Sequence, residues 1–170
     1  MLKKDLNKFI KDALDEDIGE GDHTSLATMP KSSKNKAALL VKDNGIIAGV
    51  TLAKKIFNHI DTNLNLRILI NDGEKVKDGD VAFLVEGKSI SILKAERLIL
   101  NCMQHMSAIA TKTNYLNSLI SHTRVKILDT RKTTPLNRKI EKWAVRIGGG
   151  ENHRFGLYDM IMIKVLIKST

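Results

Sequence analysis

The stretch VKILDTRKTTP, residues 125–135, decides the fold, because a short apolar run passes directly into a polar, cation-bearing loop. Residues 125–128 read as a strand that ends at Asp129. Residues 138–147 predict a helix, and residues 159–164 predict a second strand. Strand, helix and strand in this order is the pattern of a parallel sheet or barrel, so this part of the chain is predicted to begin a (β/α) barrel.

Four residues predict the two ends of that helix. Thr134 is expected to be its N-cap and Pro135 its first helical residue, while Gly148 or Gly149 is expected to close its C-terminal end. These structural roles do not exclude a role in function.

The preceding residues predict a small sheet covered by helices. An amphipathic helix begins near Leu2 and ends towards Gly19, and a turn with a helix cap at its end follows. Two short runs, residues 37–41 and 45–50, flank an Asp-Asn-Gly turn and predict paired strands. The segments that follow predict a short helix, two strands and one or two buried helices; their residues are 52–60, 64–70, 81–86 and 92–120.

The predicted fold class is therefore α/β. We expect an N-terminal α+β, sandwich-like domain over residues 1–106 and the first part of an incomplete (β/α) barrel over residues 107–170. The 42% of apolar residues can build a packed core, to which we assign the single cysteine, Cys102. No apolar stretch reaches the roughly 18 residues of a membrane span and the start lacks a secretory segment, so we expect a cytoplasmic protein without a membrane partner.

The net charge of +9 favours negatively charged partners. Only 4% of the residues are aromatic and no dense Lys/Arg block occurs, which argues against nucleic acid. The charge is concentrated between Arg131 and Lys142. Since ligands of parallel α/β folds bind beyond the carboxyl ends of the strands, we expect a cation cluster there. Its members lie on connections and strand ends of one unit: Arg131, Lys132, His153, Arg154 and Lys164.

Such a cluster can clamp carboxylates with Arg and meet phosphate with Lys and backbone amides. For Arg131 and Lys132 a simple solvated surface is the alternative.

The motifs around these residues strongly resemble the quinolinate phosphoribosyltransferase family. The matching segments are residues 16–25, 95–97, 100–101, 107–111, 129–135, 141–146, 148–154, 156–159 and 163–164.

The resemblance covers nearly everything from residue 15 to residue 164. It implies synthesis of nicotinate mononucleotide from quinolinate and phosphoribosyl pyrophosphate, with release of carbon dioxide and pyrophosphate and with Mg²⁺ as cofactor. By position, it implies quinolinate binding by Arg131, Lys132, His153 and Arg154, a pocket shaped by Thr130, and Lys164 facing the phosphoribosyl group. The resemblance further implies that Arg97 reaches the site of a neighbouring subunit, and therefore a homodimer or higher oligomer.

Two positions depart from the family pattern. After Lys164 the family continues with Asp-Asn-His, whereas this chain continues with Val165 and ends at Thr170. We therefore expect a premature stop, a frameshift or a deliberately shortened chain, without the later carboxylates for magnesium and ribose and with little activity of its own. Leu136 stands where the family often has Gly, which predicts a local difference in the loop.

Two other functions remain open from the residues. One is a non-catalytic module that binds anions or nucleic acid, which the net charge favours and the few aromatic residues oppose. The other is a related phosphoribosyltransferase that acts on another pyridine carboxylate. The combination of Arg131, Lys132 and Arg154 favours a dicarboxylate over a monocarboxylate.

Overall fold

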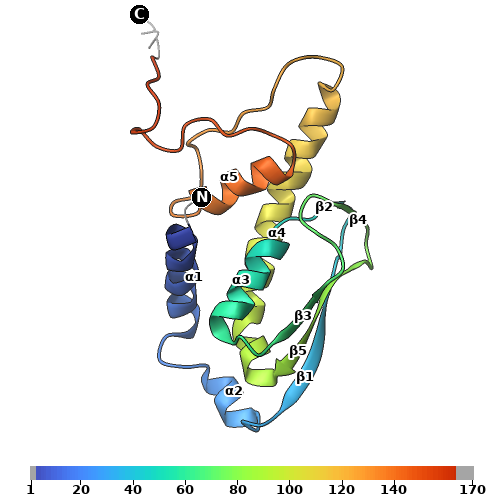
Figure 1. The fold of residues 1–170 in the computed structure, drawn as a ribbon, viewed down its shortest axis with the longest axis vertical. Helices are drawn as coiled ribbons and strands as arrows, with labels where there is room; N and C mark the ends of the chain where they lie inside the picture. The colour runs from blue at the N-terminus through green and yellow to red at the C-terminus, as the bar shows by residue number, and fades with distance from the viewer. Residues whose placement is uncertain (1–2, 164–170) are drawn as a thin grey trace, which may run out of the picture.

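A computed structural model describes residues 3–163 of the chain, which has a mixed α/β fold (Figure 1). The elements follow one another as α1 (Lys3–Ile18), α2 (His23–Thr28), β1 (Lys34–Leu40), β2 (Gly45–Ile46), α3 (Val50–Ile60), β3 (Asn65–Ile68), β4 (Lys75–Val76), β5 (Val81–Lys88), α4 (Ser89–Leu119) and α5 (Arg138–Ile147). The helices predicted from the apolar periodicity are confirmed. The two-residue strand β4 was not predicted.

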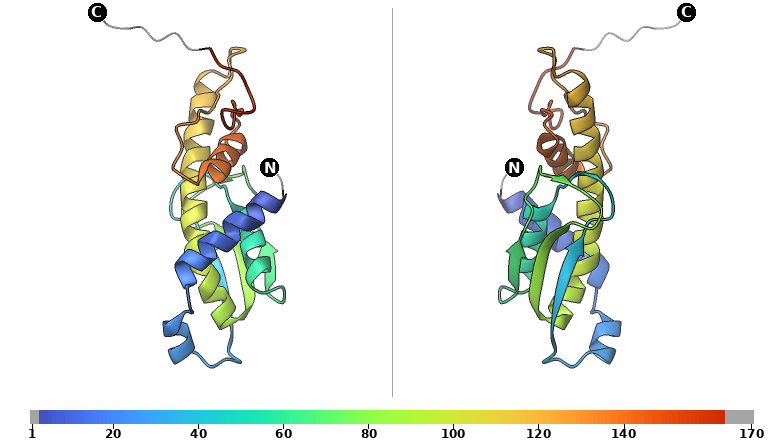
Figure 2. Two further views of the ribbon diagram at one scale, coloured as in Figure 1. Left: turned by 90° about the vertical axis from the view of Figure 1, so that its left-hand side faces the viewer. Right: turned by 90° about the vertical axis from the view of Figure 1, so that its right-hand side faces the viewer.

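Helix α4 runs along most of the molecule (Figures 1 and 2). It is a single helix of 31 residues, where the sequence left one or two open. The sheet and α3 pack along one half of it, and α5 packs across the other half. The expected domain division after residue 106 falls inside α4. The core contains Cys102, as predicted, and its largest fully buried apolar side chains are Ile10, Val50, Leu52, Ile56, Ile99 and Met106.

The main sheet has the order β1-β5-β3 and is antiparallel throughout. The predicted pairing of the two runs around Asn44 is wrong, because β1 pairs with β5 and β2 pairs with β4. Side chains of α4 take the backbone groups of the second run instead. The N–H of Ile46 donates to Thr111 Oγ1 and that of Ala48 to Ser107 Oγ, both at 2.9 Å. Helix α4 thus satisfies a strand edge that a hairpin partner was expected to satisfy.

The predicted first part of the (β/α) barrel consists of α5 and one parallel bridge. Of the strand predicted at residues 125–128, only Leu128 forms a bridge, and its partner is Glu151. The Glu151 N–H donates to the Ile127 carbonyl at 2.9 Å, and the Asp129 N–H donates to the Glu151 carbonyl at 3.1 Å. Residues 159–163 are irregular, so the second strand is wrong over that range. A strand needs paired neighbours, and among the described residues this run has none.

Helix α5 spans Arg138–Ile147, the range that the sequence predicted, but its N-terminal cap differs from the prediction. Its N-cap is Asn137, so Thr134 is not the cap and Pro135 is not the first helical residue. The Asn137 N–H donates to the Thr134 carbonyl at 3.1 Å and closes a tight turn, in which Leu136 has a φ of 65°. A Pro followed by a positive φ is typical of a type II turn, where Gly is preferred at the second of these positions.

The other end of α5 agrees with the prediction. Gly148 is the C-cap, and Gly149 follows with a φ of 90°. A Cβ added to Gly148 would lie 2.9 Å from Ala110 Cα in α4. Only a glycine allows the end of α5 to approach α4 this closely, and this packing places the two loops that flank α5.

Candidate functional site

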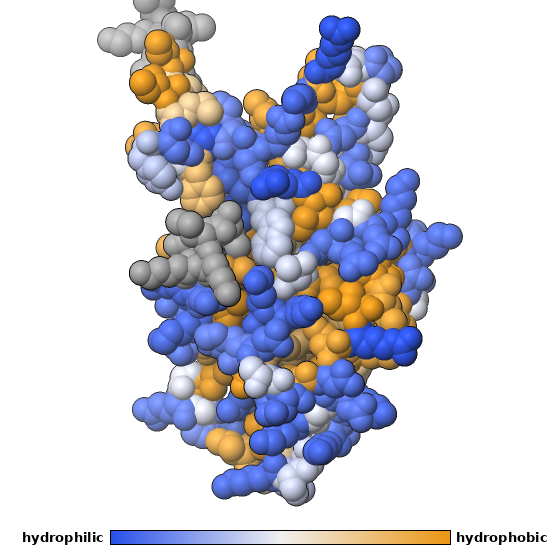
Figure 3. All heavy atoms as spheres, in the orientation of Figure 1, coloured by the Kyte–Doolittle hydropathy of each residue, from blue (hydrophilic) through white to orange (hydrophobic). Residues whose placement is uncertain are grey.

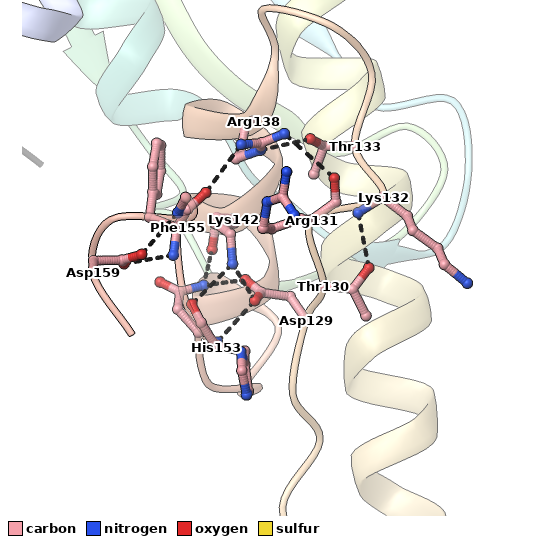
Figure 4. Close-up of polar contacts among 12 residues, drawn as sticks. Asp129, Thr130, Arg131, Lys132, Thr133, Arg138, Lys142, His153, Phe155 and Asp159 are labelled. Carbon is pink, nitrogen blue, oxygen red and sulfur yellow. Dashed lines mark hydrogen bonds and ion pairs between the residues drawn. The ribbon is translucent and has the colours of Figure 1, made fainter. Parts of the chain in front are cut away.

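Two loops flank α5 and carry the predicted cations (Figure 4). The first loop, residues 129–137, contains Thr130, Arg131 and Lys132, and the second loop, residues 150–159, contains His153 and Arg154. The parallel bridge between Leu128 and Glu151 sets the two loops side by side. The structure thus brings these five predicted residues into one region around α5.

A buried ion pair joins the bases of both loops. The Lys142 ammonium, on α5, donates to the Asp129 carboxylate, and the two side chains are only 3% and 6% exposed. Lys142 also donates to the His153 carbonyl at 3.0 Å, while the His153 N–H donates to Asp129 at 2.9 Å. Asn152 Nδ2 supplies a further donor to the same carboxylate at 2.5 Å. His153 is therefore held by its backbone, which leaves its ring available.

Arg138 lies one turn before Lys142 on α5 and connects the first loop, near Arg131, with the second loop at Phe155. Its Nε donates to Thr133 Oγ1 at 3.1 Å, and its Nη2 donates to the Arg131 carbonyl at 3.4 Å. Its Nη1 donates to the Phe155 carbonyl in the second loop at 3.0 Å. Sequence reasoning gave neither Arg138 nor Lys142 a role. The signal was their spacing of four, which places two cations on one face of a helix that borders the site.

The two remaining arginines have donors without protein partners. Nε of Arg131 and Nε of Arg154 are buried and donate to no acceptor among the described residues. Buried polar groups are normally satisfied, so an unpaired guanidinium N–H in each loop indicates a place for an external acceptor. Lys132 is exposed and its backbone N–H donates to Thr130 Oγ1 at 3.0 Å, which fixes the start of the first loop.

A second acidic residue ties the first loop to α4. The Glu141 carboxylate on α5 accepts from His105 Nε2 at 2.9 Å and from the Thr134 N–H at 3.2 Å. Burial acts to raise the pKa of Glu141, but the hydrogen bonds from Thr134 and His105 outweigh it and hold the pKa below its usual value. His105 is partly exposed, and it bonds to the site through Glu141.

Asp159 shapes the end of the second loop. Its carboxylate accepts from the N–H groups of Phe155 at 2.6 Å and Gly156 at 2.9 Å. These two backbone donors lower the pKa of Asp159. Asp159 therefore serves a turn, where the sequence predicted the beginning of a strand.

The other predicted site residues lie apart from this region. Arg97 is exposed on α4 and lines a groove with residues 39–47, and that groove contains none of the loop cations. Lys164 lies outside the described residues. Within residues 3–163, no group of three or more His, Cys, Asp and Glu side chains could hold a metal ion. The same residues contain no helix long and apolar enough to cross a membrane.

Family models match both parts of the chain. The N-terminal domain of quinolinate phosphoribosyl transferase matches residues 22–107, and the C-terminal domain of the same enzyme matches residues 109–167. The structure resembles the crystal structure of NadC from Streptococcus pyogenes, with a TM-score of 0.90 and 36% identity. That match covers 96% of this chain and 58% of the other.

Curated relatives give the same result. Quinolinate phosphoribosyltransferase [decarboxylating] 1b of Nicotiana tabacum is 49% identical over 161 residues, which are 94% of this chain and 45% of the relative. A probable nicotinate-nucleotide pyrophosphorylase [carboxylating] of Bacillus subtilis is 44% identical over 163 residues, 96% of this chain and 55% of the relative. The chain spans about half the length of these relatives. Some plant relatives are named as mitochondrial or chloroplastic proteins.

Proposed function

Because the chain belongs to the quinolinate phosphoribosyltransferase family, we propose that it carries the substrate-gripping part of such an enzyme. The reaction joins quinolinate to the phosphoribosyl group of phosphoribosyl pyrophosphate. Pyrophosphate and carbon dioxide leave, and nicotinate mononucleotide is the product. This product is an intermediate on the route to NAD.

The observation that carries the proposal is a pair of buried Nε donors without a protein acceptor. Arg131 and Arg154 each have a buried Nε without a protein acceptor, and they come from adjacent loops. Arginine binds carboxylates through parallel N–H donors, and quinolinate presents two carboxylates on one small ring. One arginine for each carboxylate gives both unpartnered donors a task in the same site.

The neighbouring cations have matching tasks in this proposal. The backbone N–H and carbonyl of His153 are both held by hydrogen bonds, and its ring donates a hydrogen bond to a carboxylate of the ligand. Lys132 supplies a mobile positive charge at the exposed edge of the site. Thr130 shapes the pocket through its bond to the Lys132 N–H. Cleavage of the bond between ribose and pyrophosphate leaves a cationic carbon and a growing anion, so fixed charges stabilise the transition state more than a strong base would.

Magnesium, which the resemblance implies, finds no ligand set in the described part of the chain. The carboxylates of this region belong to Asp129, Glu141, Glu151 and Asp159, and each is bonded to Lys142, His105, Lys126 or backbone N–H groups. No step of the proposed reaction is assigned to a metal ion held by these residues. We propose that magnesium accompanies the diphosphate of the donor, since Mg²⁺ commonly binds through substrate phosphates and water.

We also propose a homodimer, in which Arg97 serves the partner's site. Its support is position: Arg97 lies on an exposed groove of α4 and away from the loops of its own chain. A cytoplasmic location stays a prediction.

Substrate binding and turnover test the proposal separately. We expect calorimetry to detect quinolinate binding to the 170-residue chain, and we expect nicotinate, which has one carboxylate, to bind at least about ten-fold more weakly. Arg131→Ala or Arg154→Ala should weaken quinolinate binding by about 30-fold, while Arg146→Ala, at an exposed position in the last turn of α5, should not. Turnover is measured as nicotinate mononucleotide formed with phosphoribosyl pyrophosphate and magnesium. A preference for nicotinate in both assays would overturn the choice of substrate.

A further inference from the structure

We propose that Arg138 is a positioning residue for dicarboxylate binding, which sets the distance between Arg131 and Arg154 without touching the ligand. This inference rests on the proposed function. It concerns how the site is held in shape rather than which residues contact quinolinate.

The contacts of Arg138 join the two arginines through their backbones. Its Nη2 donates to the carbonyl of Arg131 itself, at 3.4 Å. Its Nη1 donates at 3.0 Å to the carbonyl of Phe155, the residue that directly follows Arg154. A single planar guanidinium thus fixes the chain at one arginine and beside the other (Figure 4).

The third contact orients this guanidinium. Nε of Arg138 donates to Thr133 Oγ1 at 3.1 Å, so Nε, Nη1 and Nη2 all point to protein acceptors. Arg138 lies in the first turn of α5, which packs on α4, and the fork is therefore held by a rigid element. A lysine at this position would keep the charge, but one ammonium group could not reach acceptors in this planar arrangement.

Other contacts keep the loops together when Arg138 is changed. The parallel bridge at Leu128 and the Asp129–Lys142 pair join the bases of the loops independently of it. Loss of Arg138 should therefore loosen the loops near Arg131 and Phe155. The bases of the loops should stay together. Such loosening misplaces Arg131 and Arg154 and weakens ligand binding, because the two arginines must contact both carboxylates of the ligand at the same time.

The experiment compares Arg138→Gln and Arg138→Lys with Arg146→Gln. Arg146 is an exposed cation in the last turn of the same helix, so its variant removes one charge from α5 and leaves the loops untouched. Thr133→Val is a milder variant that removes one acceptor of Arg138. Quinolinate affinity is measured by calorimetry, and amide hydrogen exchange of both loops is measured in the protein without ligand.

We expect both Arg138 variants to bind quinolinate about ten-fold more weakly or worse, with faster exchange in residues 131–134 and 153–156. Thr133→Val should weaken binding by a smaller factor, and Arg146→Gln should behave like the unchanged protein. Addition of guanidinium chloride at low millimolar concentration should restore part of the affinity of an Arg138→Ala variant and none of that of Arg138→Lys.

Two results would overturn the inference, and a third would overturn the proposed function. Full affinity of Arg138→Lys would overturn the inference, because charge alone would then suffice. Unchanged loop exchange in Arg138→Gln would overturn it as well, whatever the affinity. If the unchanged protein failed to bind quinolinate, the proposed function would fall, and the exchange measurement alone would decide whether Arg138 positions the loops.

Discussion

The buried pair of Lys142 and Asp129 allows a direct test of what holds the two loops. We predict that Lys142→Met strongly destabilises the chain. Methionine keeps the apolar stem of lysine and nearly its length, but it removes the ammonium group. The Lys142 side chain is 3% exposed, and its ammonium group donates to Asp129 and to the His153 carbonyl. The carboxylate of Asp129 would remain buried without its counter-charge.

The expected size follows from the contacts that remain. Breaking a buried ion pair from one side commonly costs about 3–5 kcal/mol, because an uncompensated charge stays buried. Asp129 would keep two donors, the His153 N–H at 2.9 Å and Asn152 Nδ2 at 2.5 Å, which places the loss at the lower end. We therefore expect a loss of about 3 kcal/mol in the free energy of unfolding.

The double variant Lys142→Met with Asp129→Asn should recover part of this loss. With both charges gone, no ion is left buried, and we expect a coupling of about 2 kcal/mol between the two changes. The control is the exposed pair of Lys126 and Glu151, at 2.6 Å with side chains 67% and 53% exposed. Lys126→Met should cost less than about 1 kcal/mol, since exposed ion pairs contribute little.

Urea denaturation followed by circular dichroism at 222 nm measures these values at pH 7. With a slope of about 2 kcal/mol per molar urea, Lys142→Met should lower the midpoint by about 1.5 M. A shift no larger than that of Lys126→Met would refute the reasoning, because burial would then make no difference to the pair. Strict additivity in the double variant would also refute it, because the two charges would then be independent.

Three further predictions concern α5 and the turn before it. Leu136→Gly should stabilise the chain by roughly 0.5 kcal/mol in the same urea assay, because Leu136 is 95% exposed and its φ of 65° costs more than glycine's added freedom; a loss of stability would contradict the turn. Gly148→Ala should lower the melting temperature, at a cost of about 1–3 kcal/mol, because the new Cβ would lie 2.9 Å from Ala110 Cα; a melting temperature equal to that of the unchanged protein would show that the two helices are not in close contact. Burial alone would raise the pKa of Glu141, yet its hydrogen bonds lower it, so its stabilisation is present above the ordinary value of 4.5 and is lost as the pH falls through the lower folded value. Glu141→Gln should therefore flatten the acid side of the stability curve, and an unchanged acid side would count against this role of Glu141.

Local periodicity was sufficient to predict the longer helices of this chain, whereas the segment of the short helix α2 was predicted only as a turn with a helix cap. The apolar spacing in α1, α3 and α5 indicates one buried face in each case, and those helices form where predicted. Pairing of strands was harder, because it depends on groups far apart in the sequence. The run after Asn44 pairs with β4 and bonds to Ser107 and Thr111, at sequence separations of 59 and 65 residues. No local turn signal contains that information.

The arrangement of the two loops around α5 was predictable only in part, for the same reason. The loops that carry Arg131 and Arg154 could be recognised because both flank one predicted helix, and the structure sets them side by side. The roles of Arg138 and of the Glu141–His105 contact could not, since each depends on the exact direction of a side chain toward another segment. The N-cap of α5 was misplaced because Thr134 and Pro135 match a helix N-terminus and a type II turn equally well.

The charge of this region changes meaning once the contacts are known. The sequence concentrates cations between Arg131 and Lys142, and a concentration of this kind favours an anionic partner. Yet Lys142 neutralises Asp129, and Arg138 donates to backbone carbonyls and a hydroxyl. A ligand therefore meets a smaller positive charge than the composition indicates, but one whose geometry is fixed by the internal cations. For a small dicarboxylate, fixed geometry at Arg131 and Arg154 favours selectivity more than added charge would, because a diffuse positive surface binds any anion.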